Sequence, residues 1–227
     1  MKLEFELEKS YDILIKRIMK SWDVDSYCII NFLYYSNYTL LRKDKEYLNA
    51  IENSTYLFPD GIGMQILYKH KYNIKLPNVN GTDFTPELLA FIFSNKIPIA
   101  IYGTTTSNLF FFEKWLMENY NKQSYYIKDG FSLLDFKLIK NKSVLLVGRG
   151  SPLQEKWVLQ NLDIIKEKEL LVLTVGGFFD YFSPNNKRAP ILFRKLKLEF
   201  LYRFLQSPKR NFKKFFRNFN IINDLFE

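Results

Sequence analysis

The sequence predicts an α/β fold, a parallel sheet flanked by helices, with a basic amphipathic helical appendage at its C-terminal end. Short apolar runs alternate with longer amphipathic ones along the 227 residues, a pattern typical of βαβ units. Several of the apolar runs stop at glycine, and basic residues crowd the last part of the chain. We therefore divide the chain into a core, residues 1–195, and an appendage, residues 196–227.

The predicted strands follow one another along the core. Residues 26–35 are expected to form a strand that passes into a helix, and further strands are expected over 97–102, 143–147 and 170–175. Each of the last three is followed by a glycine. A glycine at the end of a buried strand favours a tight turn there.

Two helix starts are indicated by their capping residues. Thr85 is followed by Pro86, and Ser151 is followed by Pro152, with Gln154 three residues after the serine. Both patterns fit an N-cap with proline in the first turn. Strand, glycine turn and capped helix in succession predict parallel strands, and ligands of such sheets lie at the carboxyl ends of the strands.

Composition and charge exclude several classes of protein. Apolar residues make up 47% of the chain and aromatic residues 18%, which excludes a disordered or fibrous chain. Residues 187–227 hold eleven Lys and Arg against three acidic residues, whereas the other 186 residues hold 22 against 21. A neutral body with a basic tail predicts an anionic partner at one end, either a membrane surface or nucleic acid.

Targeting and redox features point to a cytoplasmic protein. Acidic residues at positions 4, 6 and 8 interrupt the stretch where a signal peptide would be apolar. No uncharged apolar run approaches the roughly 18 residues of a spanning helix, so any membrane contact is expected to be peripheral. Cys28 stands alone in an apolar run, where a buried side chain is expected. No metal-ligand cluster is apparent, and no metal site is expected.

The segment 144–155 carries the most informative motif. Gly148 and Gly150 let the backbone approach a ligand, and the helix that follows would aim N–H groups at an anion such as a diphosphate, with Arg149 adding charge. An ordinary strand-to-helix turn with a capping box explains the pattern equally well. Leu153 occupies the third glycine position of the dinucleotide fingerprint, which disfavours a nicotinamide-dependent enzyme.

Asp60 stands beside Gly61, ahead of an apolar helical run. A carboxylate on a glycine turn can deprotonate a substrate hydroxyl as a general base. A turn-forming aspartate is the commoner explanation of Pro-Asp-Gly, so this motif alone does not establish a catalytic role.

Two further loops follow predicted strands. Gly177 ends a glycine pair ahead of Asp180 and Arg188, which favours close contact between the backbone of the pair and a ligand. The Asp180 carboxylate would accept a hydrogen bond from a sugar hydroxyl or a base edge. Capping of the next turn explains Asp180 equally well. Gly103 and Thr104 begin a hydroxyl-rich loop before a helix, where a Ser/Thr N-cap is the strong alternative.

The tail has an aromatic face backed by cations. Phenylalanine and isoleucine fall at helical spacing, with basic residues elsewhere on the helical wheel: Phe212, Phe215, Phe216, Phe219 and Ile222 against Lys213, Lys214 and Arg217. This pattern favours a helix lying in an anionic membrane interface. Packing on the chain's own core explains it equally well. Nucleic-acid binding is disfavoured, because no DNA- or RNA-binding module accompanies the charge.

In this order, the motifs resemble the WecG/TagA/CpsF family of bacterial glycosyltransferases, glycosyltransferase family 26, from about residue 27 to residue 210. The segments that carry the resemblance are 59–63, 81–83, 102–103, 147–155, 176–180, 188–190, 198–203 and 208–210. The resemblance implies a Rossmann-like core and an inverting, metal-independent and cofactor-free transfer. A hexose or an N-acetylhexosamine of the N-acetylmannosamine type would move from a UDP-sugar to a polyprenyl diphosphate-linked acceptor, in capsule or cell-wall polysaccharide synthesis.

The resemblance also assigns roles to residues of this chain. Asp60 aligns with the catalytic base of the family, and the appendage is expected to reach the anionic inner face of the cell membrane and to help complete the active site. The substrate-binding residues that the resemblance and the motifs suggest are Asn31, Gly61, Gly103, Thr104, Gly148, Arg149, Gly150, Gln154, Glu155, Gly177, Asp180, Arg188, Arg203 and Arg210.

Two positions depart from the family pattern. Ile29 stands where threonine is frequent, and Asn78 where arginine is frequent. Either change would alter sugar recognition or reduce activity, so a catalytically inactive relative that serves as a binding or assembly component is the alternative to an active enzyme. The donor sugar, the acceptor sugar and the oligomeric state stay open, with a homo-oligomer as one option.

Overall fold

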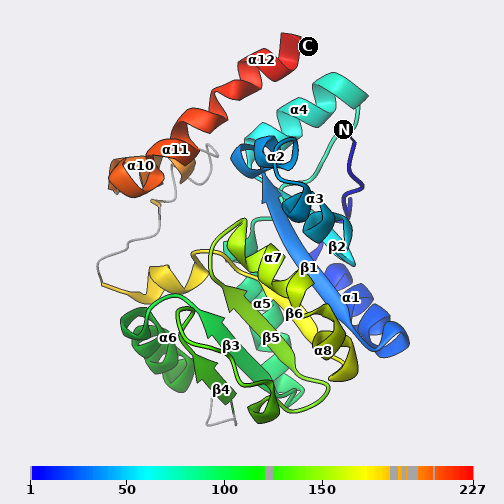
Figure 1. The fold of residues 1–227 in the computed structure, drawn as a ribbon, viewed down its shortest axis with the longest axis vertical. Coiled ribbons are helices and arrows are strands. Elements are labelled where there is room, and N and C mark those ends of the chain that lie inside the picture. The colour runs from blue at the N-terminus through cyan, green and yellow to red at the C-terminus, as the bar shows by residue number, and fades with distance from the viewer. Residues whose placement is uncertain are drawn as a thin grey trace.

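A six-stranded parallel sheet forms the centre of the molecule (Figure 1). The computed structural model describes residues 2–120, 125–184, 189–190, 193, 199–206 and 208–226. The strands are β1 (Cys28–Tyr34), β2 (Tyr56–Asp60), β3 (Ile99–Gly103), β4 (Tyr125–Lys128), β5 (Val144–Gly148) and β6 (Leu171–Thr174). They lie in the order β2-β1-β6-β5-β3-β4, and every pair of neighbours is parallel. The predicted α/β class is confirmed.

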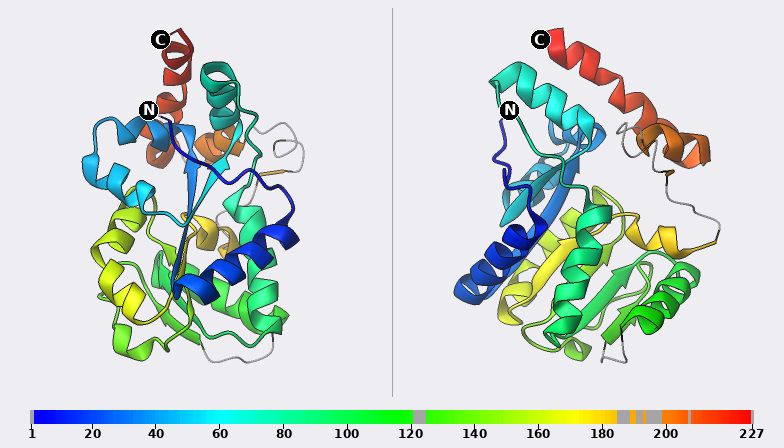
Figure 2. Two further views of the ribbon diagram at one scale, coloured as in Figure 1. Left: turned by 90° about the vertical axis from the view of Figure 1, so that its right-hand side faces the viewer. Right: turned by 180° about the vertical axis from the view of Figure 1, so that it is seen from behind.

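Helices cover both faces of the sheet and its carboxyl edge (Figure 2). One face packs against α1 (Tyr11–Asp25), α5 (Gly81–Ser94) and α6 (Thr106–Asn119), and the other against α7 (Leu153–Gln160) and α8 (Leu162–Glu167). Beyond the carboxyl end of β1 lies a third cluster with α2 (Tyr35–Leu41), α3 (Lys45–Glu52) and α4 (Ile62–Tyr72). Two short 3₁₀ helices span Phe136–Leu138 (η1) and Phe178–Phe182 (η2).

Alternation along the strands explains the two-sided core. Ile99 and Ile101 belong to the cluster on the α5 side, whereas Ala100 and Tyr102 belong to the cluster on the α7 side. Successive side chains of a strand point to opposite faces, so a parallel strand buried on both faces needs apolar residues at nearly every position. Burial on both faces therefore explains the continuous apolar runs from which β3, β5 and β6 were predicted.

The outer edge of β2 is covered by single hydrogen bonds from flanking segments. Glu6 donates its N–H to the Leu57 carbonyl (3.0 Å), and Val79 donates to the Pro59 carbonyl (3.1 Å). Pro59 has no N–H to offer outward, which suits an edge strand. The sheet therefore ends at β2 without a long row of open donors and acceptors on that side.

The two predicted N-caps are wrong. Helix α5 begins at Gly81, one turn before Thr85, because the Asn80 side chain accepts the Thr82 N–H (2.8 Å) and caps the helix there. Helix α7 begins at Leu153, and Ser151 donates its hydroxyl to Glu155 Oε1 (2.6 Å) instead of accepting a backbone N–H. The Ser151 oxygen accepts the side-chain N–H of Gln154 Nε2 (3.3 Å) in place of a backbone N–H.

Three tail helices follow the core: α10 (Glu199–Gln206), α11 (Pro208–Asn218) and α12 (Asn220–Phe226). Helix α11 packs against α2 and α12 packs against α4, at the same end of the molecule as the carboxyl edge of β1 (Figures 1 and 2). Across the described ranges, none of the helices is both long and apolar enough to cross a bilayer. The boundary predicted after residue 195 falls among residues outside the described set, and it stays a prediction.

Candidate functional site

The carboxyl edge of the sheet brings most of the predicted site residues together. Asp60 ends β2, Gly148 ends β5 and Gly103 ends β3, and the Gly176–Gly177 pair follows β6 closely. Because β1 and β6 lie between β2 and β5, Asp60 and Gly148 are three strand spacings apart, about 14 Å. An extended substrate is needed to contact both.

The turn that carries Asp60 joins β2 to α4. Asp60 is half-buried and pairs in register with Tyr34 of β1. Gly61 has φ = 83°, a value that favours glycine, and it donates its N–H to Asn78 Oδ1 at 2.6 Å. Asn78, the residue that departs from the family pattern, therefore holds the peptide that follows Asp60. This contact was not predicted from the sequence.

The glycines at the ends of β3 and β5 are needed by the protein itself. A Cβ at Gly148 would lie 2.5 Å from ring atoms of Phe179 and 3.1 Å from the Gly176 carbonyl oxygen, and a Cβ at Gly103 would lie within 2.6 Å of Gly148 backbone atoms. Close packing of neighbouring turns accounts for both glycines. Gly150 and Gly177 lie on the same edge, and an added Cβ at Gly150 would meet no atom within 4 Å.

Gln154 and Glu155 point inward from the first turn of α7. Gln154 is 3% exposed; its Oε1 accepts the Gly176 N–H (3.1 Å), and its Nε2 donates to Glu155 Oε1 (2.9 Å). Glu155 is 1% exposed and also accepts from Ser151. The two side chains link the turn after β5 to the turn after β6, so their contribution to the site is to fix its shape.

Arg149 lies over an aromatic ring beside this turn. Its guanidinium carbon is 5.4 Å from the centroid of the Tyr102 ring, within the range of a cation–π contact. Burial raises the pKa of the Tyr102 phenol, so the ring stays neutral beneath the cation. This stacking orients a half-buried guanidinium at the carboxyl edge.

Asp180 is held by one residue of the loop after β3 and by one residue of the first turn of α6. Its Oδ1 accepts from Thr104 Oγ1 (2.9 Å) and from Asn108 Nδ2 (2.8 Å). The predicted Ser/Thr N-cap in this loop is confirmed, since Thr105 is the N-cap of α6 and accepts the Asn108 N–H (3.3 Å). Asn108 was not predicted as a site residue. Its position in the first turn of the helix that follows the loop was the signal in the sequence that could have identified it.

Asn31 is buried within β1 and not at its carboxyl end. It donates from Nδ2 to Ser54 Oγ (2.8 Å) and accepts at Oδ1 from Thr174 Oγ1 (2.7 Å). Both halves of its amide therefore join neighbouring parts of the fold. Ile29, two residues earlier, packs in the core on the α7 side. Substrate contact by Asn31 stays a prediction.

Helix α3 supports α7 from outside the site. Lys156 Nζ lies 2.7 Å from Asp44 Oδ2 and 3.2 Å from Glu46 Oε2, and its hydrogen bond holds the pKa of the Asp44 carboxyl below the usual range. In the same contact between α3 and α7, burial raises the pKa of the Tyr47 phenol well above its ordinary value, and the negative charge of Glu155 is the second cause.

The tail is anchored to the core through a buried carboxylate. Asp224 of α12 is 3% exposed; it accepts from Tyr35 Oη (2.6 Å) and pairs with Arg42 Nη2 (2.7 Å). Burial and the hydrogen bond to this carboxylate raise the pKa of the Tyr35 phenol above its usual range. Nearby, Ile221 lies against Gly63 at the start of α4. The tail thus docks beside the turn that carries Asp60.

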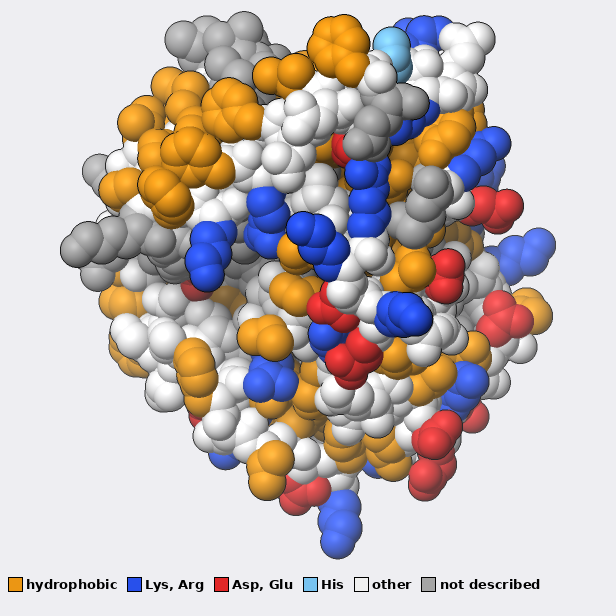
Figure 3. Space-filling view, turned by 45° about the horizontal axis from the view of Figure 1, so that its top comes forward, with side chains coloured by type: hydrophobic (Ala, Val, Ile, Leu, Met, Phe, Trp, Pro, Cys, Tyr) orange, Lys and Arg blue, Asp and Glu red, His pale blue; other side chains and the backbone are white. Residues whose placement is uncertain are grey.

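The opposite side of the tail presents hydrophobic side chains to solvent (Figure 3). These exposed residues are Leu205, Phe212, Phe216, Phe219, Ile222 and Phe226. Phe215 is half-buried; its ring stacks on Phe204 of α10, with centroids 4.0 Å apart, and also contacts the rings of Phe216 and Phe219. Packing on the core is therefore confirmed for one side of the tail, and membrane contact by the exposed side stays a prediction.

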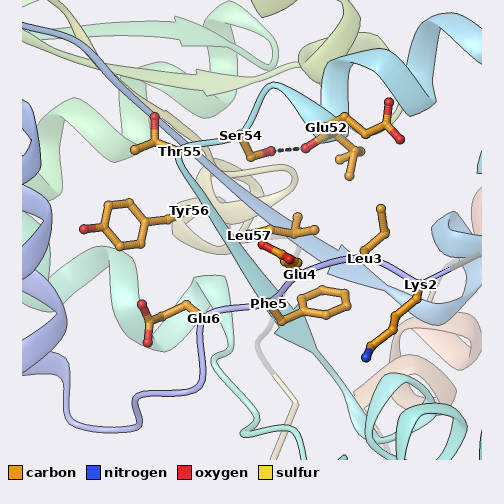
Figure 4. A pocket seen from close by; sticks show the side chains of 11 residues that line it. Lys2, Leu3, Glu4, Phe5, Glu6, Glu52, Ser54, Thr55, Tyr56 and Leu57 are labelled. Carbon is orange, nitrogen blue, oxygen red and sulfur yellow. Dashed lines mark hydrogen bonds between the residues drawn. The ribbon is translucent and has the colours of Figure 1, made fainter. Parts of the chain in front are cut away.

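Three predicted arginines have no described side chain. Arg188 lies outside the described residues, and Arg203 and Arg210 lie on α10 and α11 with their side chains outside the described set. A separate cavity of about 440 Å³ lies along the outer edge of β2 (Figure 4). Its lining comes from residues 2–6 and from the segment 51–57, and it contains none of the predicted site residues.

The parallel sheet, with helices packed on both faces and glycine turns at its carboxyl edge, defines a doubly wound type of α/β protein. A family model described as "Glycosyl transferase WecG/TagA/CpsF family" matches residues 3–226, so the chain belongs to this family. It is 28% identical over 173 residues to a Staphylococcus aureus (strain MW2) protein and 28% identical over 178 residues to a Bacillus subtilis (strain 168) protein. Both relatives are named N-acetylglucosaminyldiphosphoundecaprenol N-acetyl-beta-D-mannosaminyltransferase.

The alignments cover 72% and 74% of this chain, and 66% and 67% of the S. aureus and B. subtilis relatives. The matched region thus spans about two thirds of each relative. The resemblance inferred from the motifs is confirmed at the level of the family.

Proposed function

We propose that the protein is an inverting glycosyltransferase that moves a hexose or an N-acetylhexosamine, of the N-acetylmannosamine type, from a UDP-sugar to a polyprenyl diphosphate-linked acceptor. The reaction would serve bacterial surface polysaccharide synthesis. Family membership across residues 3–226 carries the proposal. The names of the two relatives support a lipid diphosphate acceptor. Asp60 and the Gly148 turn on one sheet edge support a site that handles both substrates.

Asp60 is the proposed general base. It would take the proton of the acceptor hydroxyl while the oxygen attacks the anomeric carbon and the bond from that carbon to UDP breaks. Asp60 precedes the N-terminus of α4, where the helix dipole favours the ionised carboxylate that a base requires. Asp60 is half-buried, so part of its surface is exposed at the sheet edge.

The leaving diphosphate is the proposed ligand of the turn after β5. N–H groups at the start of α7 and the guanidinium of Arg149 offer positive charge there. Charge that develops on UDP as the bond breaks would be stabilised at this place. The diphosphate, the anomeric carbon and the acceptor hydroxyl would then lie one after another between the Gly148 turn and Asp60, which are about 14 Å apart along the sheet edge.

Replacing the base tests the proposal directly. In Asp60→Asn the side chain keeps its shape but accepts a proton far less readily, so transfer is expected to fall by about 10²–10⁴-fold while UDP-sugar binding, measured by calorimetry, stays within about threefold. Asp12→Asn, on an exposed position of α1, is the matched control. Turnover of Asp60→Asn near that of the control would remove Asp60 from this role.

We further propose that the tail holds the enzyme at the inner face of the membrane. Its exposed phenylalanines, Phe212 and Phe216 among them, would enter the headgroup region. Because each half-exposed ring adds roughly 1 kcal/mol of transfer free energy, Phe212→Gln with Phe216→Gln should weaken binding to anionic vesicles roughly thirtyfold. Unchanged vesicle binding by this double variant would contradict the role of the tail.

A further inference from the structure

The last turn of α4 carries a concentration of positive charge that the proposed reaction does not use. Lys69, His70 and Lys71 end the helix; Lys69 and His70 are exposed and Lys71 is half-buried. Lys2 lies against the same turn, with its Nζ 5.7 Å from the centroid of the Tyr72 ring. Together with the exposed Lys75, these five residues form what we call the α4 basic end.

Acidic residues are scarce around this cluster. The sequence has none between Gly61 and Thr82. In the packed tail helix, Asp224 is buried against Arg42 and Tyr35. The exposed Glu4, two residues from Lys2, is the nearest acid along the N-terminal segment. Within the part of the chain that the structure describes, ion pairs therefore leave a net positive charge at the end of α4.

The α4 basic end shares one end of the molecule with the apolar side of the tail. Helix α12 packs on α4, with Ile221, Tyr72 and Ile74 in one hydrophobic cluster, and Figures 1 and 2 show the two helices side by side. In Figure 3 hydrophobic side chains, Lys and Arg side chains and the histidine of the chain occupy the same face. Cations next to exposed phenyl rings match the chemistry of an anionic bilayer surface.

We propose that the α4 basic end binds the anionic lipid surface together with the tail, so that the protein meets the membrane at two places. This inference rests on the proposed membrane role of the tail. Helix α4 runs from the Asp60 turn to the basic end over 11 residues, which corresponds to about 16 Å. With the basic end on the headgroups, the Asp60 turn therefore lies at most about 16 Å from the lipid surface.

Vesicle sedimentation of the full chain tests this second contact. The probe is a vesicle of phosphatidylcholine with 30 mol% (about one lipid in three) phosphatidylglycerol, compared with phosphatidylcholine alone. Lys69→Gln with Lys71→Gln removes two charges from the basic end. Lys16→Gln with Lys20→Gln, both exposed on α1 and distant from the tail, is the matched control.

Each lysine near an anionic surface contributes about fivefold in binding, so the α4 double variant should bind anionic vesicles roughly 25-fold more weakly than the unchanged chain. The control should change by less than about threefold, and Lys69→Arg with Lys71→Arg should restore binding. Equal loss in both double variants, binding of the α4 variant like the unchanged chain, or loss of affinity for duplex DNA without loss for vesicles would each overturn the inference.

Sugar transfer to a soluble short-chain acceptor separates this inference from the proposed function. Both double variants should transfer at the rate of the unchanged chain, because neither pair of lysines is part of the site. Absence of transfer by all three proteins would contradict the proposed function, and the vesicle result would still decide the second membrane contact.

Discussion

The hydrogen bond between Asn78 and Gly61 makes a sharp prediction about the turn that carries the proposed base. Asn78 Oδ1 accepts the Gly61 N–H at 2.6 Å from a solvent-exposed position. Asn78→Ala removes the acceptor, and water can replace it, so the loss of stability should be near 1 kcal/mol. For a chain of this length that corresponds to a fall in melting temperature of about 2–4 °C.

The effect on catalysis should be larger than the effect on stability. Without Asn78 the peptide after Asp60 is free to rotate, and a displacement of the carboxylate by about 1 Å costs up to roughly a hundredfold in rate. We expect kcat of Asn78→Ala to fall by about 10- to 100-fold with KM within about threefold, measured as transfer from a UDP-sugar to a short-chain lipid acceptor.

Two further variants make the test specific. Asn78→Asp keeps an acceptor for the Gly61 N–H but adds a negative charge near Asp60, which favours the protonated form of Asp60 and should move the acidic limb of the kcat/KM profile to higher pH. Asn53→Ala removes an exposed side chain that donates to the Asn49 carbonyl (2.9 Å), and it should leave kcat unchanged. A kcat of Asn78→Ala within twofold of that control would refute the argument.

Three other perturbations follow from described contacts. Gly148→Ala places a Cβ 2.5 Å from the Phe179 ring and should lower the free energy of unfolding by about 1–3 kcal/mol, measured by urea titration. Asp224→Ala removes charge-assisted bonds worth about 2 kcal/mol from the tail contact, so trypsin should cleave the tail faster while core melting changes little. Lys156→Gln should destabilise the protein by less than about 1 kcal/mol at pH 7. Because Lys156 holds the pKa of Asp44 below its ordinary value, that stabilisation is complete above about pH 4 and is lost as pH falls through the folded-state pKa. Unfolding should show the same difference between the two proteins at pH 7 and pH 5 and a smaller difference at pH 3.

The strands that were predicted share one physical property. β1, β3, β5 and β6 are buried on both faces, and their sequences are continuous apolar runs. β2 and β4 were not predicted, because both are edge strands. β2 contains Pro59 and ends at Asp60, residues that indicate a turn, and every residue of β4 is half-buried.

The sequence predicted which loops form the candidate site, but it did not predict which side chains contact one another there. Predicted strand ends and their glycines placed the turns after β3, β5 and β6 on one edge, whereas the strand that brings Asp60 to this edge was not predicted and the role of Asp60 came from the resemblance. The partners depend on packing between segments far apart in the chain: Gln154 with Gly176 across 22 residues, and Asp180 with Asn108 across 72. Local pattern gives no information about such pairs, because only the sheet order brings them together.

The position of β2 at the border of the sheet has a consequence for how the molecule opens. Its inner side joins β1 along five residues, whereas single bonds from Glu6 and Val79 cover the outer side. Amide protons of β2 should therefore exchange with deuterated water sooner than those of β5, which is flanked by strands on both sides. The proposed base thus stands on an edge strand, which adjusts to an incoming lipid-linked sugar more easily than β5, the flanked strand that bears the proposed diphosphate turn.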